Sequence, residues 1–184
     1  MSDYRRWFIP GGTYFFTVVA EARRPILATE NGRHFLRTAI AKVRETFSFE
    51  IIATVLLPDH WHLVMQLPPG DSDYSIRMKR IRSEFTSQWL AMGLPEAPIS
   101  EPRKSKGERG IWQPRFWEHT VQDEDDLERC CDYIHWNPVK HGHVTEVRDW
   151  PWSSFHRFVE QGQYEPHWGR SDPEANTHHR DWGE

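Results

Sequence analysis

The stretch Pro58-Asp59-His60-Trp61-His62-Leu63-Val64-Met65 places two histidines, one residue apart, in an apolar run. Successive side chains of a β-strand point to opposite faces, so His60 and His62 share one face while Trp61 points to the other. Two imidazoles side by side have the spacing of metal ligands. The stretch therefore predicts a strand of a sheet and a candidate metal site on one face of it. A purely structural role is the competing interpretation of an isolated histidine pair.

The segments on either side of this strand predict an α+β fold. The predicted elements are strands at 13–19, 49–57, 60–67 and 111–121, helices at 32–47, 73–92 and 123–137, and a loop at 93–110. Their order, β-α-β-β-α-β and then a further helix, is that of a ferredoxin-like antiparallel sheet with helices on one face. The additional C-terminal helix carries Tyr133.

Length and composition predict one domain with a tail. The chain has 184 residues, of which 38% are hydrophobic and 27% charged, as is typical of a globular protein. We expect a domain at 1–160 and a polar tail at 161–184. There is no apolar segment of about 18 residues and no signal-like start, so we expect a cytoplasmic protein with no membrane partner. The adjacent cysteines Cys130 and Cys131 lack the CxxC spacing of zinc ligands and favour buried thiols.

Charge is unevenly distributed along the chain. The formal net charge of −4 alone argues against a nucleic-acid partner. However, screening limits each patch to a range of about 8 Å, so separate basic patches act independently of the total. The candidate DNA contacts are Arg5, Arg6, Lys79, Arg82, Arg115 and Lys140, with Trp117 as a platform for an unpaired base. The competing interpretations are that these cations only form a solvated surface and that the tryptophan packs in the core.

The last predicted helix supplies the second half of the candidate site. Tyr133 and Asn137 are four residues apart and therefore project from the same side of this helix. If the helix crosses the histidine-bearing face, Tyr133 approaches the metal and the Asn137 carbonyl oxygen completes its shell. Two imidazoles and an amide oxygen suit a divalent ion with open positions, such as Mg²⁺ or Mn²⁺. His119 is a rival third ligand, whereas His135 points about 160° away from Asn137.

Five segments of the chain occur in an order that is found in a known family. They are 4–6 (YRR), 11–17 (GGTYFFT), 57–62 (LPDHWH), 111–119 (IWQPRFWEH) and 132–142 (DYIHWNPVKHG). Together they resemble the HUH single-tyrosine transposases, and most closely the REP-associated tyrosine transposases. The resemblance implies that His60 and His62 hold the catalytic cation, that Tyr133 is the nucleophile, and that the residue four positions later is the third ligand. Related insertion-sequence enzymes often carry glutamine there, where this chain has Asn137.

The resemblance also implies a substrate and a reaction. The substrate is single-stranded DNA with REP-like hairpins, and the expected active form is a monomer. Attack by Tyr133 on a phosphate gives a 5′-phosphotyrosine and a free 3′-hydroxyl, and a later 3′-hydroxyl can reverse the step. A cation would stabilise the phenolate of a group whose pKa is ordinarily about 10. The alternatives are a non-catalytic module that binds single-stranded nucleic acid, and a phosphodiesterase in which a metal-activated water attacks.

Overall fold

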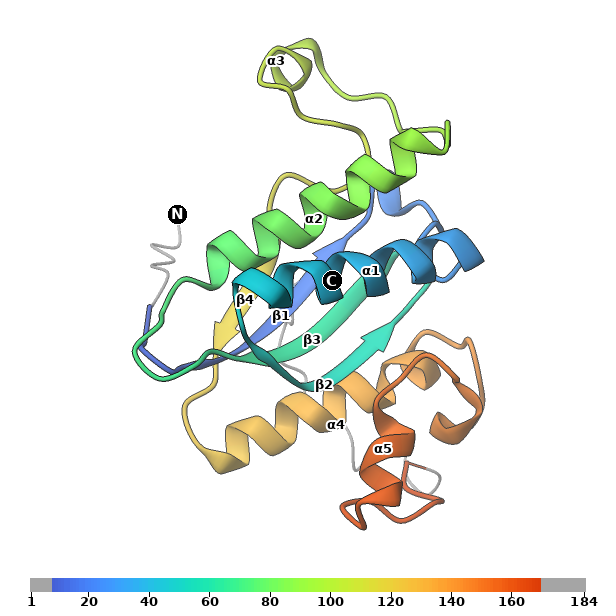
Figure 1. The fold of residues 1–184 in the computed structure, drawn as a ribbon. Coiled ribbons are helices and arrows are strands. Elements are labelled where there is room, and N and C mark those ends of the chain that lie inside the picture. The colour runs from blue at the N-terminus through green and yellow to red at the C-terminus, as the bar shows by residue number, and fades with distance from the viewer. Residues whose placement is uncertain (1–7, 170–184) are drawn as a thin grey trace, which may run out of the picture.

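The computed structural model describes residues 8–169 (Figure 1), so the predicted contacts Arg5 and Arg6 lie outside the described residues. The elements are β1 (Thr13–Val19), η1 (Glu21–Arg23), α1 (Glu30–Thr46), β2 (Glu50–Leu56), β3 (His60–Gln66), α2 (Tyr74–Ala91), α3 (Glu101–Lys104), β4 (Trp117–Thr120), α4 (Glu124–Lys140), η2 (Val147–Asp149) and α5 (Phe155–Glu160).

The four strands form one antiparallel sheet in the order β2-β3-β1-β4. This is the strand order of a ferredoxin-like sheet, and it confirms the predicted α+β fold. Strands β1 and β3 occupy the centre, and their register places Thr17 opposite His62 and Val19 opposite His60. The candidate histidines therefore lie on a central strand, with a partner on each side to fix its position.

The two faces of the sheet carry separate cores. Helices α1 and α2 cover one face and α4 lies across the other (Figure 1). Because the histidines alternate with Trp61 along β3, and Trp61 packs under α1 and α2, both imidazoles lie on the α4 face. The core under α1 and α2 includes Phe16, Trp61, Leu63, Phe85 and Trp89. The core under α4 includes Phe15, Val64, Cys130 and Ile134.

Three predicted segments differ from the structure by more than two residues, whereas the other predicted boundaries lie within two residues of those observed. The fourth strand covers only 117–120 rather than 111–121, because Pro114 has no N–H for a ladder bond and Trp112 forms only an isolated bridge with Ala20. The predicted loop at 93–110 contains the short helix α3. Helix α4 continues through Pro138 to Lys140, beyond its predicted end at residue 137. The extension places Lys140 on the same helix as Tyr133.

His135 anchors α4 to the C-terminal segment. Its Nε2 lies 2.8 Å from Ser154 Oγ, and its ring packs edge-on against Phe158 and Tyr164, with centroid distances of 4.7 and 5.2 Å. Burial, with smaller contributions from the charges of Arg157 and His156, lowers the pKa of His135 to about 3. The folded protein therefore holds this imidazole neutral far below its ordinary pKa of about 6.5.

We expect His135 to make stability fall with decreasing pH. Between pH 6.5 and about 3, the unfolded chain binds a proton at residue 135 that the folded chain does not, so the free energy of unfolding decreases by up to about 1.4 kcal/mol per pH unit. Urea unfolding of His135→Gln at pH 7 and pH 5 should show a shallower pH dependence than wild type. The exposed His34→Gln serves as control. An unchanged slope in His135→Gln would contradict this assignment.

Candidate functional site

The two imidazoles of β3 lie side by side beneath α4. Their ring centroids are 4.8 Å apart, and both side chains are almost completely buried. Each ring is held at Nδ1: Thr17 Oγ1 lies 2.9 Å from Nδ1 of His62, and Asp59 Oδ1 lies 2.7 Å from Nδ1 of His60. When Nδ1 of a neutral ring donates to such a partner, Nε2 carries the lone pair that a metal ion needs.

Helix α4 brings Tyr133 and Asn137 to these imidazoles. The buried Asn137 places Oδ1 at 3.3 Å from Nε2 of His60. The ring of Tyr133 packs edge-on against His62 at 5.4 Å and against Phe15 at 5.9 Å. The structure thus assembles the four residues that the sequence pattern predicts at one place, from a strand and a helix that lie far apart in the chain.

The distance between two of the candidate donor atoms fits a hexacoordinate divalent cation. Neighbouring ligands around Mg²⁺ lie about 3 Å apart, because each is about 2.1 Å from the ion. The separation of 3.3 Å between Nε2 of His60 and Oδ1 of Asn137 is close to that value. An imidazole nitrogen and an amide oxygen at this distance are able to serve as neighbouring ligands of such an ion, and the ring of His62 lies beside that of His60.

Lys140, which lies on the same helix as Tyr133, contacts the tyrosine hydroxyl. Its Nζ donates a hydrogen bond of 2.9 Å to Tyr133 Oη and lies 4.8 Å from the centre of the ring. The lysine was predicted as a DNA contact, and its side chain is exposed. A cation in this position stabilises negative charge on the tyrosine oxygen and is also able to meet a phosphate.

His119, the rival third ligand, lies in a separate cluster of side chains. His119 lies on β4, where its Nε2 is 2.6 Å from Oδ2 of Asp126. His119, Asp126 and Cys130 offer ligand atoms within 4.8 Å of one another, but the Asp126 carboxylate also accepts from the backbone N–H of Gln122. This arrangement is that of a hydrogen-bonded link between β4 and the start of α4. It is separate from the pair on β3.

The arginines of α2 are not all exposed. Arg77 is 1% exposed, donates to the carbonyl of Ser48 and pairs with Asp71. Arg82 is partly buried and donates to the carbonyl of Gln113, and burial lowers its pKa to about 10. The competing interpretation of Arg82 as part of a solvated face does not fit, because the 111–116 segment partly covers it, and its role as a DNA contact stays a prediction.

Other predicted DNA contacts remain accessible. Lys79 and Arg115 are exposed. Lys79 also lines a hollow of about 670 Å³ between α2 and the segment at 103–116, together with Arg103 and Arg109. Trp117 is partly buried on the α4 face and packs edge-on against Phe15 at 5.8 Å. Packing within the protein therefore already buries part of the Trp117 ring.

Sequence reasoning missed three residues of the site. Asp59 and Thr17 bind the histidines, and the ring of His141 lies 5.0 Å from that of His60. Asp59 directly precedes His60, so a signal was present in the quoted stretch. Thr17 and His141 had none, because their positions depend on strand register and on the extension of α4 past Pro138.

Comparison with known proteins identifies the family. The family model described as "Transposase IS200 like" matches residues 10–137, a span that holds the histidine pair, Tyr133 and Asn137. A protein of Escherichia coli (strain K12) described as a REP-associated tyrosine transposase is 46% identical over 168 residues, which cover 91% of this chain and 91% of that protein. The chain belongs to the REP-associated tyrosine transposases of the IS200-like family. The resemblance carried by the five sequence segments is confirmed.

Two further matches agree with this assignment. A Haemophilus influenzae protein assigned to the same class is 46% identical over 171 residues, which cover 92% of this chain and 94% of that protein. A solved structure of a REP-associated tyrosine transposase bound to a REP hairpin aligns with a TM-score of 0.75 at 42% identity, and the match covers 94% of each chain. Transposases are enzymes, so the family assignment places this chain among enzymes.

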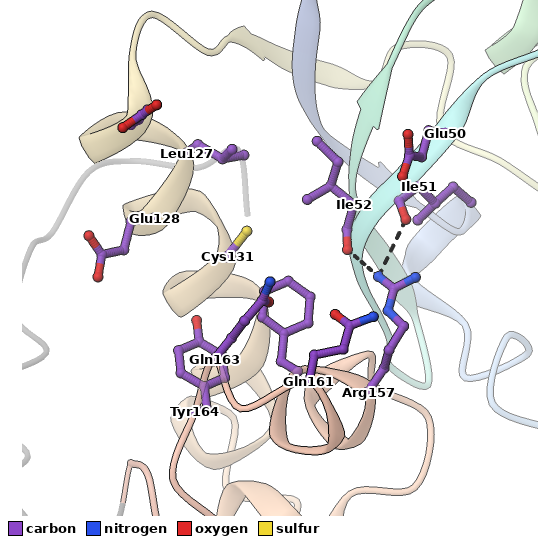
Figure 2. Close-up of a pocket in the computed structure, with 12 residues that line it drawn as sticks. Glu50, Ile51, Ile52, Leu127, Glu128, Cys131, Arg157, Gln161, Gln163 and Tyr164 are labelled. Carbon is purple, nitrogen blue, oxygen red and sulfur yellow. Dashed lines mark hydrogen bonds between the residues drawn. The ribbon is translucent and has the colours of Figure 1, made fainter.

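A second hollow of this transposase lies away from the histidines. It encloses about 400 Å³ between β2, α4 and α5 (Figure 2), and Arg157 reaches across it to the carbonyls of Ile51 and Ile52. Its lining includes Glu50, Glu124 and Glu128, and acidic walls of this kind repel phosphate.

Among residues 8–169, no helix has the length and apolar character that crossing a membrane requires.

Proposed function

We propose that this transposase cleaves and rejoins single-stranded DNA that carries a REP-like hairpin, with Tyr133 as the nucleophile. The observation that carries the proposal is the convergence of Tyr133 with His60, His62 and Asn137. A relative of the same family that binds a REP hairpin supports the choice of substrate.

The reaction is a transesterification at phosphorus. Oη of Tyr133 forms a bond to phosphorus while the bond between phosphorus and the 3′-oxygen breaks. The phenol loses its proton to solvent, and the leaving oxygen takes one up as a 3′-hydroxyl. The products are a 5′-phosphotyrosine and a free 3′ end, and the phosphodiester energy is retained for rejoining. Lys140 stabilises the charge on Oη, to which it already donates a hydrogen bond.

The proposed cofactor is Mg²⁺ or Mn²⁺, held by His60, His62 and Asn137. Such an ion, when bound, polarises a phosphate oxygen and so favours attack at phosphorus. The protein contributes the orientation: the imidazoles are buried and hydrogen-bonded at Nδ1, and α4 sets the tyrosine beside them. We further propose a monomer as the active form, since one chain supplies the nucleophile and all three ligands.

The exposed cations are proposed to track the DNA backbone. Lys79, Arg115 and Lys140 stay predicted contacts on the described surface, and Arg5 and Arg6 stay predicted contacts outside it. Trp117 stays a predicted stacking residue, through the part of its ring that is accessible.

A labelled hairpin oligonucleotide tests the proposal. The wild-type protein, a divalent cation and single-stranded DNA with a REP-like stem are incubated and separated on a denaturing gel. We expect a DNA band shifted by the mass of the protein, which a matched fully double-stranded DNA does not give. Cleavage without a shifted band would favour the water-dependent phosphodiesterase. Binding without cleavage would favour the non-catalytic module.

Removal of the Lys140 charge should slow adduct formation. A charge-assisted hydrogen bond contributes about 1.5–3 kcal/mol, which corresponds to a rate decrease of about 10- to 100-fold in Lys140→Gln. The rate constant is measured at saturating DNA, so that weaker binding does not enter. Lys42→Gln, at an exposed lysine of α1, is the control and should keep the wild-type rate. Equal rates in the two variants would show that Lys140 has no part in the step.

A further inference from the structure

The turn between β2 and β3 carries a carboxylate, that of Asp59, which contacts both the imidazole of His60 and the guanidinium of Arg23. Oδ1 of Asp59 lies 2.7 Å from Nδ1 of His60, and Oδ2 accepts a hydrogen bond of 2.9 Å from Nη1 of Arg23. The His60 side chain is 1% exposed, and that of Asp59 is 20% exposed. One carboxylate therefore links an exposed guanidinium to a buried imidazole of the site.

We propose that Asp59, held in place by Arg23, is a positioning residue that fixes the ring and tautomer of His60 so that Nε2 faces the cation. The inference deepens the proposed function, because it rests on the cation site assigned there. Asp59 itself is not a ligand in this account. It acts through the imidazole, as carboxylates behind metal-binding histidines do in general.

The geometry of Asp59 suits this role, because its carboxylate oxygen Oδ1 lies 2.7 Å from Nδ1 of His60. An ionised carboxylate only accepts hydrogen bonds, so Nδ1 of His60 must be the donor. In a ring that carries its single proton on Nδ1, the lone pair is on Nε2, which is the nitrogen 3.3 Å from Oδ1 of Asn137.

The backbone around the turn is built to present Arg23. The N–H of Ala20 donates to the carbonyl of Asp59, and the N–H of Leu27 donates to the carbonyl of Pro58, each at 2.8 Å. Between these two anchors, Ala22 and Arg23 have φ of 54° and 49°, in the left-handed region that residues other than glycine rarely adopt. Such a conformation persists only where its surroundings enforce it, and here it directs the guanidinium to Asp59.

The second imidazole gives an internal comparison. His62 is held at Nδ1 by the neutral hydroxyl of Thr17 rather than by a carboxylate. A carboxylate acceptor strengthens the hydrogen bond and raises the basicity of the ligand nitrogen more than a hydroxyl does. Of the two rings, His60 should therefore depend more strongly on its partner.

Manganese affinity measured by calorimetry on the full chain, without DNA, tests the role of Asp59. We expect Asp59→Ala to bind Mn²⁺ about 10- to 100-fold more weakly than wild type. Asp59→Asn retains an acceptor oxygen and should lose less than Asp59→Ala. Arg23→Gln should lose a few-fold, and Arg24→Gln, whose guanidinium bonds Pro95 instead, should equal wild type.

The outcomes separate this inference from the proposed function. If the wild type forms the DNA adduct but Asp59→Ala and Asp59→Asn both bind Mn²⁺ as wild type does, the positioning role is wrong and the function stands. If the wild type forms no adduct but the affinities fall in the expected order, the positioning role stands without that function. Should Asp59→Ala fail to fold, the ¹⁵N spectrum of the wild-type protein decides, with Arg23→Gln and Asp59→Asn for comparison. The proton of His60 must reside on Nδ1 in the wild type, and a wild-type proton on Nε2 would overturn the proposal.

Discussion

Tyr133→Phe should abolish the covalent protein–DNA adduct, with a loss of at least about 1,000-fold in the rate of cleavage. The variant lacks the only atom of the side chain that can bond to phosphorus, whereas the aromatic ring that packs against Phe15 and His62 remains. Fold and hairpin affinity should therefore stay close to wild type. The measurement is adduct formation on a denaturing gel, together with hairpin binding by fluorescence anisotropy.

A second tyrosine provides the control for this prediction. Tyr164 donates a hydrogen bond to Asp132 and packs on Phe158 and Phe155, away from the histidine pair. Tyr164→Phe also removes one phenolic hydroxyl, but at a different position, and this variant should still form the adduct. Undiminished adduct in Tyr133→Phe would exclude this residue as the nucleophile, whatever the behaviour of the control.

Removal of the cation should stop the same reaction in the wild-type protein. We expect EDTA to reduce adduct formation by at least about 100-fold, and added Mn²⁺ to restore it, because the ion supplies several kcal/mol of charge stabilisation at the phosphate. His60→Gln should behave like the chelated protein even with excess metal. Adduct that persists in EDTA would contradict a metal-dependent step.

The histidine variant needs a comparison of its own. Both site histidines are almost fully buried, so a substitution can also loosen the sheet. His34→Gln on the exposed side of α1 changes the same residue type without touching the site, and the melting temperature of each variant reports folding. Loss of the adduct in a His60→Gln protein that melts as wild type does would locate the effect at the cation.

Local sequence patterns predicted the frame of this molecule well. Alternation along β3 placed His60 and His62 on one face, and helical spacing placed Tyr133 and Asn137 on one side of α4. These predictions succeeded because each depends on the period of a single element. That α4 crosses the histidine-bearing face was only a condition at the level of the sequence, and the structure shows that the helix buries its apolar stripe there.

Contacts between distant segments escaped the same reasoning. The guanidinium of Arg82 turns inward to a carbonyl of the 111–116 segment, and nothing in the α2 pattern indicates that cover. Likewise, the bond between Arg23 and Asp59 depends on two residues with positive φ in a segment without glycine. Short-range periodicity carries no information about such contacts, because they are set by how loops close over the finished sheet.

The central claim is that the hydroxyl of Tyr133 becomes bonded to the 5′-phosphate of cleaved single-stranded DNA. The direct measurement is mass spectrometry of the trapped adduct after digestion with protease and nuclease. We predict a nucleotide 5′-phosphate on the peptide that contains Tyr133, with a 3′-hydroxyl on the released strand. A nucleotide on any other residue, or a phosphate left on the 3′ end of the released strand, would contradict the account.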